Sequence, residues 1–289
     1  DCGMFQGPKT ERELNYRDFP FEPQSVHALL LTHAHIDHSG LIPKLVRHGF
    51  TGPIYCTTPT VDLCAVMLPD SGHIQEMEVR MLNERNRKRG LPEVEPLYTL
   101  EDAIAALTNF KSVDYEQWLT PAKGIRARWW NAGHLLGSAS IEVEVERDGG
   151  KPLRILFSGD IGPDHKMLQA DPEAPTGWDC VICESTYGDV DRFERSQDKR
   201  RELMAAEVNA AAARRGVLLI PSFAVERTQE VVTDLVALME AGLVPKTDIF
   251  IDSPLANKAS AIFRKHAREL EEGDALYRAF ASPLVRATE

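Results

Sequence analysis

Three histidines and one aspartate lie within six residues near the start of the chain. They are His33, His35, Asp37 and His38 in the segment HAHIDH. Imidazole and ionised carboxylate need polar partners, and together they are the ligand set that suits zinc and related first-row metal ions. The apolar run over 26–32 predicts a strand, so the side chains of the following loop can converge on one point. The pattern therefore predicts a metal site.

Two more residues of metal-binding type follow predicted strands later in the chain. His134 follows a strand predicted over 125–130, and Asp160 follows a strand predicted over 153–157. Flanking glycines let the backbone approach a ligand closely. Either residue alone would be typical of a turn. Donors at the ends of three strands instead predict that these loops meet around a metal ion.

The order of predicted elements changes near residue 178. Before it, strands and helices are mixed, and residues 69 to about 112 predict a helical insert. After it, predicted strands alternate with helices; the strands cover 179–183, 217–221 and 248–252, and the helices cover about 197–215, 226–241 and 254–272. Alternation with short connections predicts parallel strands. We therefore expect an α/β protein with one domain over 1–185 and a second, parallel α/β domain over 186–289.

Composition favours a protein of the cytoplasm without a membrane partner. Hydrophobic residues make up 43% of the chain and charged residues 27%, and no apolar run is long enough to cross a bilayer. The five cysteines are odd in number and scattered, which excludes a disulfide scaffold. Cys180 and Cys183 lie in an apolar segment, so we expect them to be core residues of a buried strand.

The net charge of −11 is unusual for a protein that binds nucleic acid, because phosphates attract Lys and Arg. One basic cluster covers 85–89. A second consists of Arg192, Arg195, Lys199, Arg200 and Arg201. These clusters are candidate phosphate contacts, and a solvated helix face explains each of them equally well.

The candidate ligands resemble a known set of motifs. HAHIDH, Gly133-His134 and Ser158-Gly159-Asp160 resemble the second, third and fourth motifs of the metallo-β-lactamase superfamily, and Asp1 matches its first. Further segments resemble motifs of its β-CASP group, the RNA-processing nucleases that include the cleavage and polyadenylation endonucleases; these segments are 183–189, 221–227 and 252–256. The resemblance implies a metallo-β-lactamase αββα sandwich with an inserted β-CASP domain.

The resemblance also implies roles for individual residues. One zinc ion would be held by His33, His35 and His134, and a second by Asp37 and His38, with Asp160 bridging the two. Asp1 would fix a histidine tautomer through a hydrogen bond. For catalysis, Asp37 would orient the nucleophile and Glu184 would support a histidine that acts as general acid. Ser253 would either contact substrate phosphate or cap a helix.

The implied activity is hydrolysis of single-stranded RNA by a hydroxide that two zinc ions activate, internally or from the 5′ end. The family has two later histidines that nothing up to Glu289 supplies, so we expect a fold truncated at both ends and a weakly held second zinc. A DNA-directed β-CASP nuclease and a non-catalytic RNA-binding subunit remain alternatives. A homodimer also remains open.

Overall fold

The computed structural model describes residues 1–173, 176–190 and 196–288, and these residues divide into two compact units. The first unit contains the described residues of 1–132, 137–160 and 174–183. The second contains the described residues of 133–136, 161–173 and 184–289. Arg192 and Arg195 of the second basic cluster lie outside the described residues.

The first unit contains two sheets. One has the strand order β1 (Leu29–Leu30), β2 (Ile54–Thr57), β3 (Phe110–Val113), and its strands run parallel. The other has the order β4 (Leu119–Ala122), β5 (Ile125–Asn131), β6 (Ala139–Val145), β7 (Leu153–Phe157), β8 (Cys180–Ile182). Its neighbours are antiparallel except for β7 and β8, which are parallel.

The two sheets pack on each other through alternate side chains. Ala127 and Trp129 on β5 lie in one buried cluster, and Leu30, Tyr55 and Val113 from the parallel sheet pack against it. Trp129 is fully buried, and its indole Nε1 donates to the carbonyl oxygen of Leu31 over 3.1 Å. Burial of one large apolar side chain contributes about 1.5–3 kcal/mol. This contact fixes the end of β1, where the HAHIDH loop begins.

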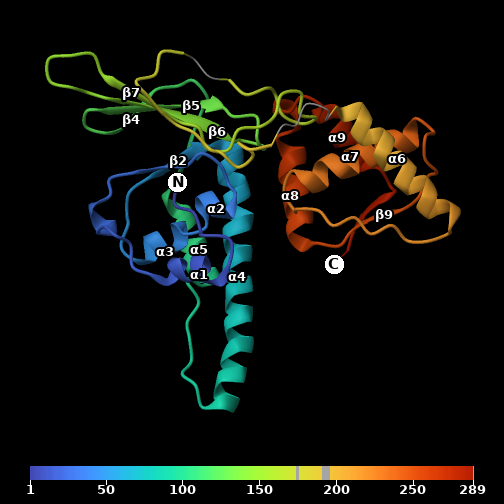
Figure 1. Cartoon of the computed structure of the whole chain (residues 1–289), viewed down its shortest axis with the longest axis horizontal. Helices are drawn as coiled ribbons and strands as arrows, with labels where there is room; N and C mark the ends of the chain where they lie inside the picture. Colours follow the sequence, from blue (N-terminus) through green and yellow to red (C-terminus); the bar gives the residue numbers. More distant parts are fainter. Residues whose placement is uncertain (174–175, 191–195, 289) are drawn as a thin grey trace. The chain divides into compact units, whose positions relative to one another are not determined.

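The helices of the first unit are α1 (Lys9–Arg12), α2 (Ile36–Ser39), α3 (Ile42–Arg47), α4 (Thr58–Arg89) and α5 (Leu100–Ala106). Figure 1 shows α4 as one long rod, whereas the sequence predicted that a separate helical insert begins at residue 69. Thr57 caps α4 by accepting from the backbone N–H of Thr60, and Gly90 ends it with a φ of 67°. The predicted break is wrong because Pro69 lies inside a helix whose neighbouring Leu68 and Gly72 are buried.

The second unit is built around α7 (Arg227–Glu240), next to α6 (Gln197–Ala213), α8 (Pro254–Lys265) and α9 (Gly273–Ala281). Its strands β9 (Ile249–Ile251) and β10 (Val285–Ala287) are parallel. Leu235, Leu238 and Met239 of α7 share a buried cluster with Val208 of α6. Short 3-10 turns in the chain cover Glu13–Tyr16, Pro23–Ser25, Leu107–Asn109 and Ala267–Glu269. The α/β character predicted from the sequence is confirmed.

Three local predictions are wrong. Residues 217–221 form no strand, and Val217 is 97% exposed, because no neighbouring strand pairs with them in the described residues. Strand β8 forms, but it is the edge strand of its sheet and its side chains, with Cys180 and Cys183, are exposed rather than buried. The helix predicted over 254–272 ends at Lys265.

No helix of the described residues is long and apolar enough to span a bilayer.

Candidate metal centre

The HAHIDH loop begins where β1 leaves its sheet and ends in the short helix α2. Leu31 is fully buried, which fixes the start of the loop. The carbonyl oxygen of His35 accepts the backbone N–H groups of His38 and Ser39 over 2.9 and 2.8 Å. The Ser39 hydroxyl donates to the carbonyl oxygen of Ala34 over 2.9 Å. These local bonds fold the loop tightly enough to bring its histidines together.

Asp160 reaches the loop through a close approach of backbone and side chain. Gly159 has a φ of 56°, and a Cβ atom at this position would lie 2.8 Å from the Cβ of Thr32. The backbone N–H of Ser158 donates to the carbonyl oxygen of Ile182 over 2.9 Å, which extends the pairing of β7 with β8. Glycine is therefore required at 159, because any side chain would push Asp160 away from the loop.

His134 lies in the connection between β5 and β6. The backbone N–H of Ala132 donates to the carbonyl oxygen of Ser138 over 3.2 Å, which closes the base of this connection. The Thr57 hydroxyl donates to the carbonyl oxygen of Gly137 over 2.6 Å. Gly137 has a φ of 81°, and a Cβ atom there would lie 2.7 Å from the Thr57 hydroxyl. The residues of the first unit that flank this loop, Ala132, Gly137 and Ser138, are thus held by bonds within that unit.

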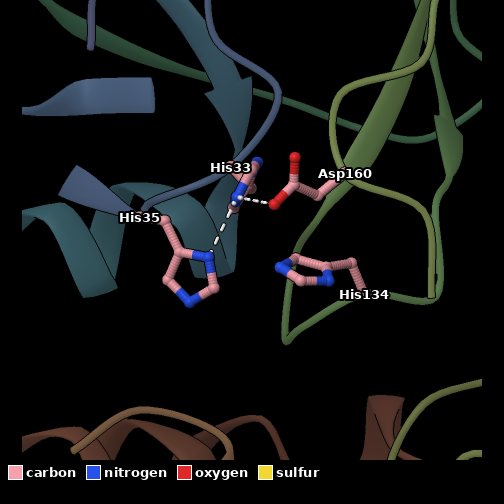
Figure 2. A group of neighbouring side chains, drawn as sticks. All are labelled: His33, His35, His134 and Asp160. Atoms are coloured by element: carbon pink, nitrogen blue, oxygen red, sulfur yellow. Dashed lines mark hydrogen bonds and ion pairs between the residues drawn. The ribbon is translucent and has the colours of Figure 1, made fainter. Parts of the chain in front are cut away.

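The candidate ligands form two overlapping groups. In the first, His33, His35, His134 and Asp160 each offer one ligand atom, and these atoms lie within 4.8 Å of one another (Figure 2). In the second, Asp37, His38 and Asp160 meet the same criterion. His33 is fully buried, whereas the Asp37 side chain is 51% exposed. All six residues predicted to bind metal therefore fall into these groups, and Asp160 belongs to both.

The ring of His38 is oriented from both sides. Its Nδ1 lies 2.8 Å from Oδ2 of Asp1, and its Nε2 lies 3.1 Å from Oδ1 of Asp160. Asp1 also accepts the backbone N–H and the hydroxyl of Thr32 over 2.7 and 2.9 Å. A proton on Nδ1 shared with Asp1 leaves Nε2 free to bind a cation beside Asp160. Asp1 thus has the contact that the sequence reasoning expected of it.

The ring of His33 is oriented in the same way by a neighbour. Its Nδ1 lies 3.0 Å from the Thr32 hydroxyl, and its Nε2 lies 3.1 Å from Nδ1 of His35 and 3.9 Å from Oδ2 of Asp160. The rings of His33 and His38 are 4.0 Å apart between centroids. The neutral form of these rings is the one that binds a metal cation.

Cys2 lies beside the centre but belongs to neither ligand group. Its backbone N–H donates to the carbonyl oxygen of His38 over 2.7 Å. Burial raises the pKa of the Cys2 thiol to about 11. A protonated thiol is a weak metal ligand, because metal ions bind the thiolate. The donor set is therefore nitrogen and oxygen.

The two remaining predicted residues lie outside both ligand groups. Glu184 accepts the backbone N–H groups of Ile161 and Thr186, each over 3.0 Å, so its carboxylate holds the chain directly after Asp160. The Ser253 hydroxyl accepts the backbone N–H of Ala256 over 3.2 Å and caps α8. The structure thus gives Ser253 the capping contact that was the alternative to a phosphate contact.

Thr32, Lys166 and Glu226 contact the ligand residues or their loops, and sequence reasoning missed all three. Thr32 adjoins the HAHIDH motif, so its position was a usable signal. Lys166 donates to the carbonyl oxygen of His134. Glu226 accepts the backbone N–H of Leu136 over 3.3 Å from 90 positions away in the chain. No local pattern points to a contact of that separation.

Known proteins with similar sequences were found over most of the chain. Residues 1–195 match the family model of the Metallo-beta-lactamase superfamily. Ribonuclease TTHA0252 of Thermus thermophilus is 34% identical over 272 residues, which cover 94% of this chain and 56% of the relative. Transcription termination factor FttA of Methanosarcina mazei is 30% identical, with 93% and 40% covered. Endoribonuclease YSH1 of Eremothecium gossypii is 29% identical, with 94% and 34% covered. The chain spans about half the length of the first relative and less of the other two.

Proposed function

Since the chain belongs to the metallo-beta-lactamase superfamily, we propose that it is a zinc-dependent β-CASP ribonuclease that hydrolyses phosphodiester bonds in single-stranded RNA. The observation that carries the proposal is the pair of ligand groups that share Asp160. Two similar proteins, of Thermus thermophilus and Eremothecium gossypii, bear the names ribonuclease and endoribonuclease. In this proposal residues 1–185 form the metallo-β-lactamase domain and 186–289 part of the β-CASP domain.

The donor set fits two divalent cations of the zinc type. Three imidazoles and one carboxylate suit a zinc ion in the first group, and one imidazole with two carboxylates would hold a second ion more weakly. The Nδ1 contacts of His38 with Asp1 and of His33 with Thr32 are the outer hydrogen bonds expected around metal-binding histidines. A net charge of −11 on the chain also favours cation binding over an empty site.

The residues of the site divide the work of phosphodiester hydrolysis. When bound, two cations would supply Lewis acidity toward a phosphate oxygen and lower the pKa of water. The exposed Asp37 carboxylate is able to accept a proton from the attacking water and to orient it. Asp160 belongs to the same ligand group as His38, and Glu184 accepts the backbone N–H of Ile161, which follows Asp160. Glu184 thereby acts as a positioning residue.

The experiment combines metal analysis with cleavage of labelled single-stranded RNA and DNA of the same sequence. We expect the purified protein to contain zinc, to cleave RNA faster than DNA, and to lose cleavage on chelation. His33→Ala should remove metal and cleavage together. His27→Ala is the matched control, because His27 is exposed and belongs to neither ligand group.

Three results would decide against the proposal. Faster cleavage of DNA than of RNA would favour the DNA-directed reading. RNA binding without cleavage by a metal-free protein would favour a non-catalytic subunit of a processing complex. Cleavage that survives both chelation and His33→Ala would show that this centre is not the catalytic one.

A further inference from the structure

The loop that carries His134 is packed against the segment 161–173. Gly133 has a φ of 62°, and a Cβ atom on it would lie 2.8 Å from the carbonyl oxygen of Ala170. A Cβ atom on Gly162 would overlap the carbonyl oxygen of Gly133 at 1.8 Å. No side chain fits at either glycine without a backbone shift. The position of His134 therefore depends on residues that come after Asp160 in the chain.

Lys166 and Glu226 hold this loop at His134 and two residues after it. The Lys166 ammonium donates to the carbonyl oxygen of His134 and lies 3.2 Å from Oε1 of Glu226. Oε2 of Glu226 accepts the backbone N–H of Leu136 over 3.3 Å. The side chains of Lys166 and Glu226 are only 13% and 8% exposed. The backbone at His134 and at Leu136 is thus bonded to one buried ion pair.

A second contact fixes the carboxylate itself. Nε2 of Gln169 donates to both oxygens of Glu226 over 3.1 and 3.2 Å. Gln169 is itself buried. With Lys166 and Leu136, it surrounds the carboxylate with donors, so each oxygen has a defined direction. A buried charge needs this number of partners to be tolerated.

The backbone of Glu226 has an unfavourable conformation, although its side chain does not cap α7. Its φ of 68° and ψ of −62° lie outside the regions that a side chain with a Cβ atom prefers. Such a backbone conformation is energetically unfavourable for a residue with a Cβ atom. Its side chain makes no hydrogen bond to the first turn of α7. Strain and burial at one residue, with the carboxylate turned onto the loop of a candidate ligand, indicate a role in the site.

We propose that Glu226 and Lys166 form a positioning pair that fixes the His134 loop, and that loss of the pair weakens metal binding by the group of His33, His35, His134 and Asp160. The inference rests on the proposed function, because it needs a metal ion at that group. It assigns the pair no contact with substrate. Its effect acts through the backbone of His134, and so the readout is metal affinity rather than turnover alone.

The test is a competition titration of metal-free, full-chain protein with Zn²⁺ and a chromophoric chelator. Glu226→Gln keeps an acceptor for Leu136 but removes the charge that pairs with Lys166, and Lys166→Met removes the donor to His134. We expect each variant to bind Zn²⁺ about 10–100-fold more weakly, the range for changes in residues that orient metal ligands. Lys166→Arg should recover part of the loss.

Glu230→Gln is the matched control. Glu230 is also a buried glutamate of α7, with 1% of its surface exposed, and it pairs with Arg227 over 2.8 Å. It belongs to neither ligand group, and its ion pairs with Arg200 and Arg227 involve residues outside the His134 loop. We expect Glu230→Gln to bind Zn²⁺ like the unchanged protein. Thermal unfolding of each metal-free variant identifies any that fails to fold. If one of the two pair variants does not fold, the other still tests the inference.

The outcomes separate this inference from the proposed function. Wild-type affinity in both Glu226→Gln and Lys166→Met overturns the inference, as does an equal loss in Glu230→Gln. His134→Ala serves as the reference for a lost ligand. If His134→Ala loses affinity but the pair variants do not, only the inference fails. If the unchanged protein binds no Zn²⁺, the proposed function fails with it.

Discussion

The loop that carries His33 and His38 and the loop that carries His134 deliver the same kind of ligand but are held differently. The first is folded by hydrogen bonds among its own residues, such as the bond from the backbone N–H of His38 to His35. The second is held by Lys166 and Glu226, which are distant in the chain. A dense motif therefore fixes its own geometry, whereas an isolated ligand depends on contacts that no local sequence reveals.

Asp160→Asn should have the largest effect, because both ligand groups include this carboxylate. Asparagine keeps the shape but offers a neutral, weaker ligand. We expect Zn²⁺ affinity to fall by more than the roughly 100-fold that marks the upper end for residues behind the ligands. RNA cleavage should be lost with it. Competition titration and metal content of the purified protein measure the change.

Asp148→Asn is the control for that substitution, because Asp148 lies in an exposed turn. Wild-type metal content in Asp160→Asn would contradict the assignment of Asp160 to both groups. It would also mean that the two loops do not supply ligands to one centre, since Asp160 belongs to both ligand groups.

Asp234→Ala should lower stability without lowering metal affinity. Asp234 is fully buried on α7 and accepts from Nε of Arg200 and Arg201 over 2.8 and 2.7 Å. Removal of one partner of a buried ion pair costs about 3–5 kcal/mol. The two arginines are 30% and 28% exposed, so water screens part of that loss and we expect about 2–3 kcal/mol. Denaturant unfolding of the metal-free protein measures it.

Glu207→Ala, at an exposed position of α6, should change the free energy of unfolding by less than about 0.5 kcal/mol. If Asp234→Ala weakens Zn²⁺ binding as much as Glu226→Gln does, then any loss of stability around α7 disturbs the position of His134. The support of that loop would then not be specific to the Glu226 and Lys166 pair.

Asp1→Ala tests the support of the first loop. Its carboxylate contacts Nδ1 of His38 and both donors of Thr32, so its loss frees the His38 ring to rotate. We expect about 10–100-fold weaker Zn²⁺ binding, or about 1.4–2.7 kcal/mol. Asp1→Asn keeps an acceptor oxygen and should lose less. Equal affinity in both variants and the unchanged protein would show that the loop is held by its backbone alone.

Much of the fold could be predicted because its signals are local. The match to the metallo-beta-lactamase superfamily confirms the family recognised from the motifs and the α/β fold class. Thr57 and Thr99 accept from backbone N–H groups three residues ahead, so the starts of α4 and α5 are visible in the sequence. The strand predicted over 217–221 failed because an apolar run becomes a strand only if another strand pairs with it.

The site was predictable to the extent that its ligands are distinctive residues. Six ligand candidates could be named, because metal-binding residue types at the ends of three strands form a pattern that separate turns do not explain. Lys166 and Glu226 could not be named, since their types are common on surfaces and only the structure shows them to be 13% and 8% exposed. Exposure also reversed the expectation for Cys180, which lies on an edge strand.

The smallest expected effect is a change in how stability depends on pH. Burial raises the pKa of the Glu226 carboxyl above the usual 4.5, and the neighbouring Glu230 raises it further, while Lys166 and Gln169 lower it. Between the unfolded and folded pKa values, the folded protein binds more protons than the unfolded chain. Its free energy of unfolding therefore falls as the pH rises through the folded pKa. Glu226→Gln lacks this titration.

Denaturant unfolding of metal-free protein, at steps from pH 4.5 upward, should therefore show a stability difference that moves in favour of Glu226→Gln as the pH rises. Parallel pH profiles for the variant and the unchanged protein would contradict this expectation. A Glu226→Gln variant that is more stable at neutral pH and yet binds Zn²⁺ more weakly would show that the two loops differ in how their ligand geometry relates to stability. The hydrogen bonds that fix the HAHIDH loop would then also stabilise the folded protein. The charged Glu226 that fixes the His134 loop would instead destabilise it.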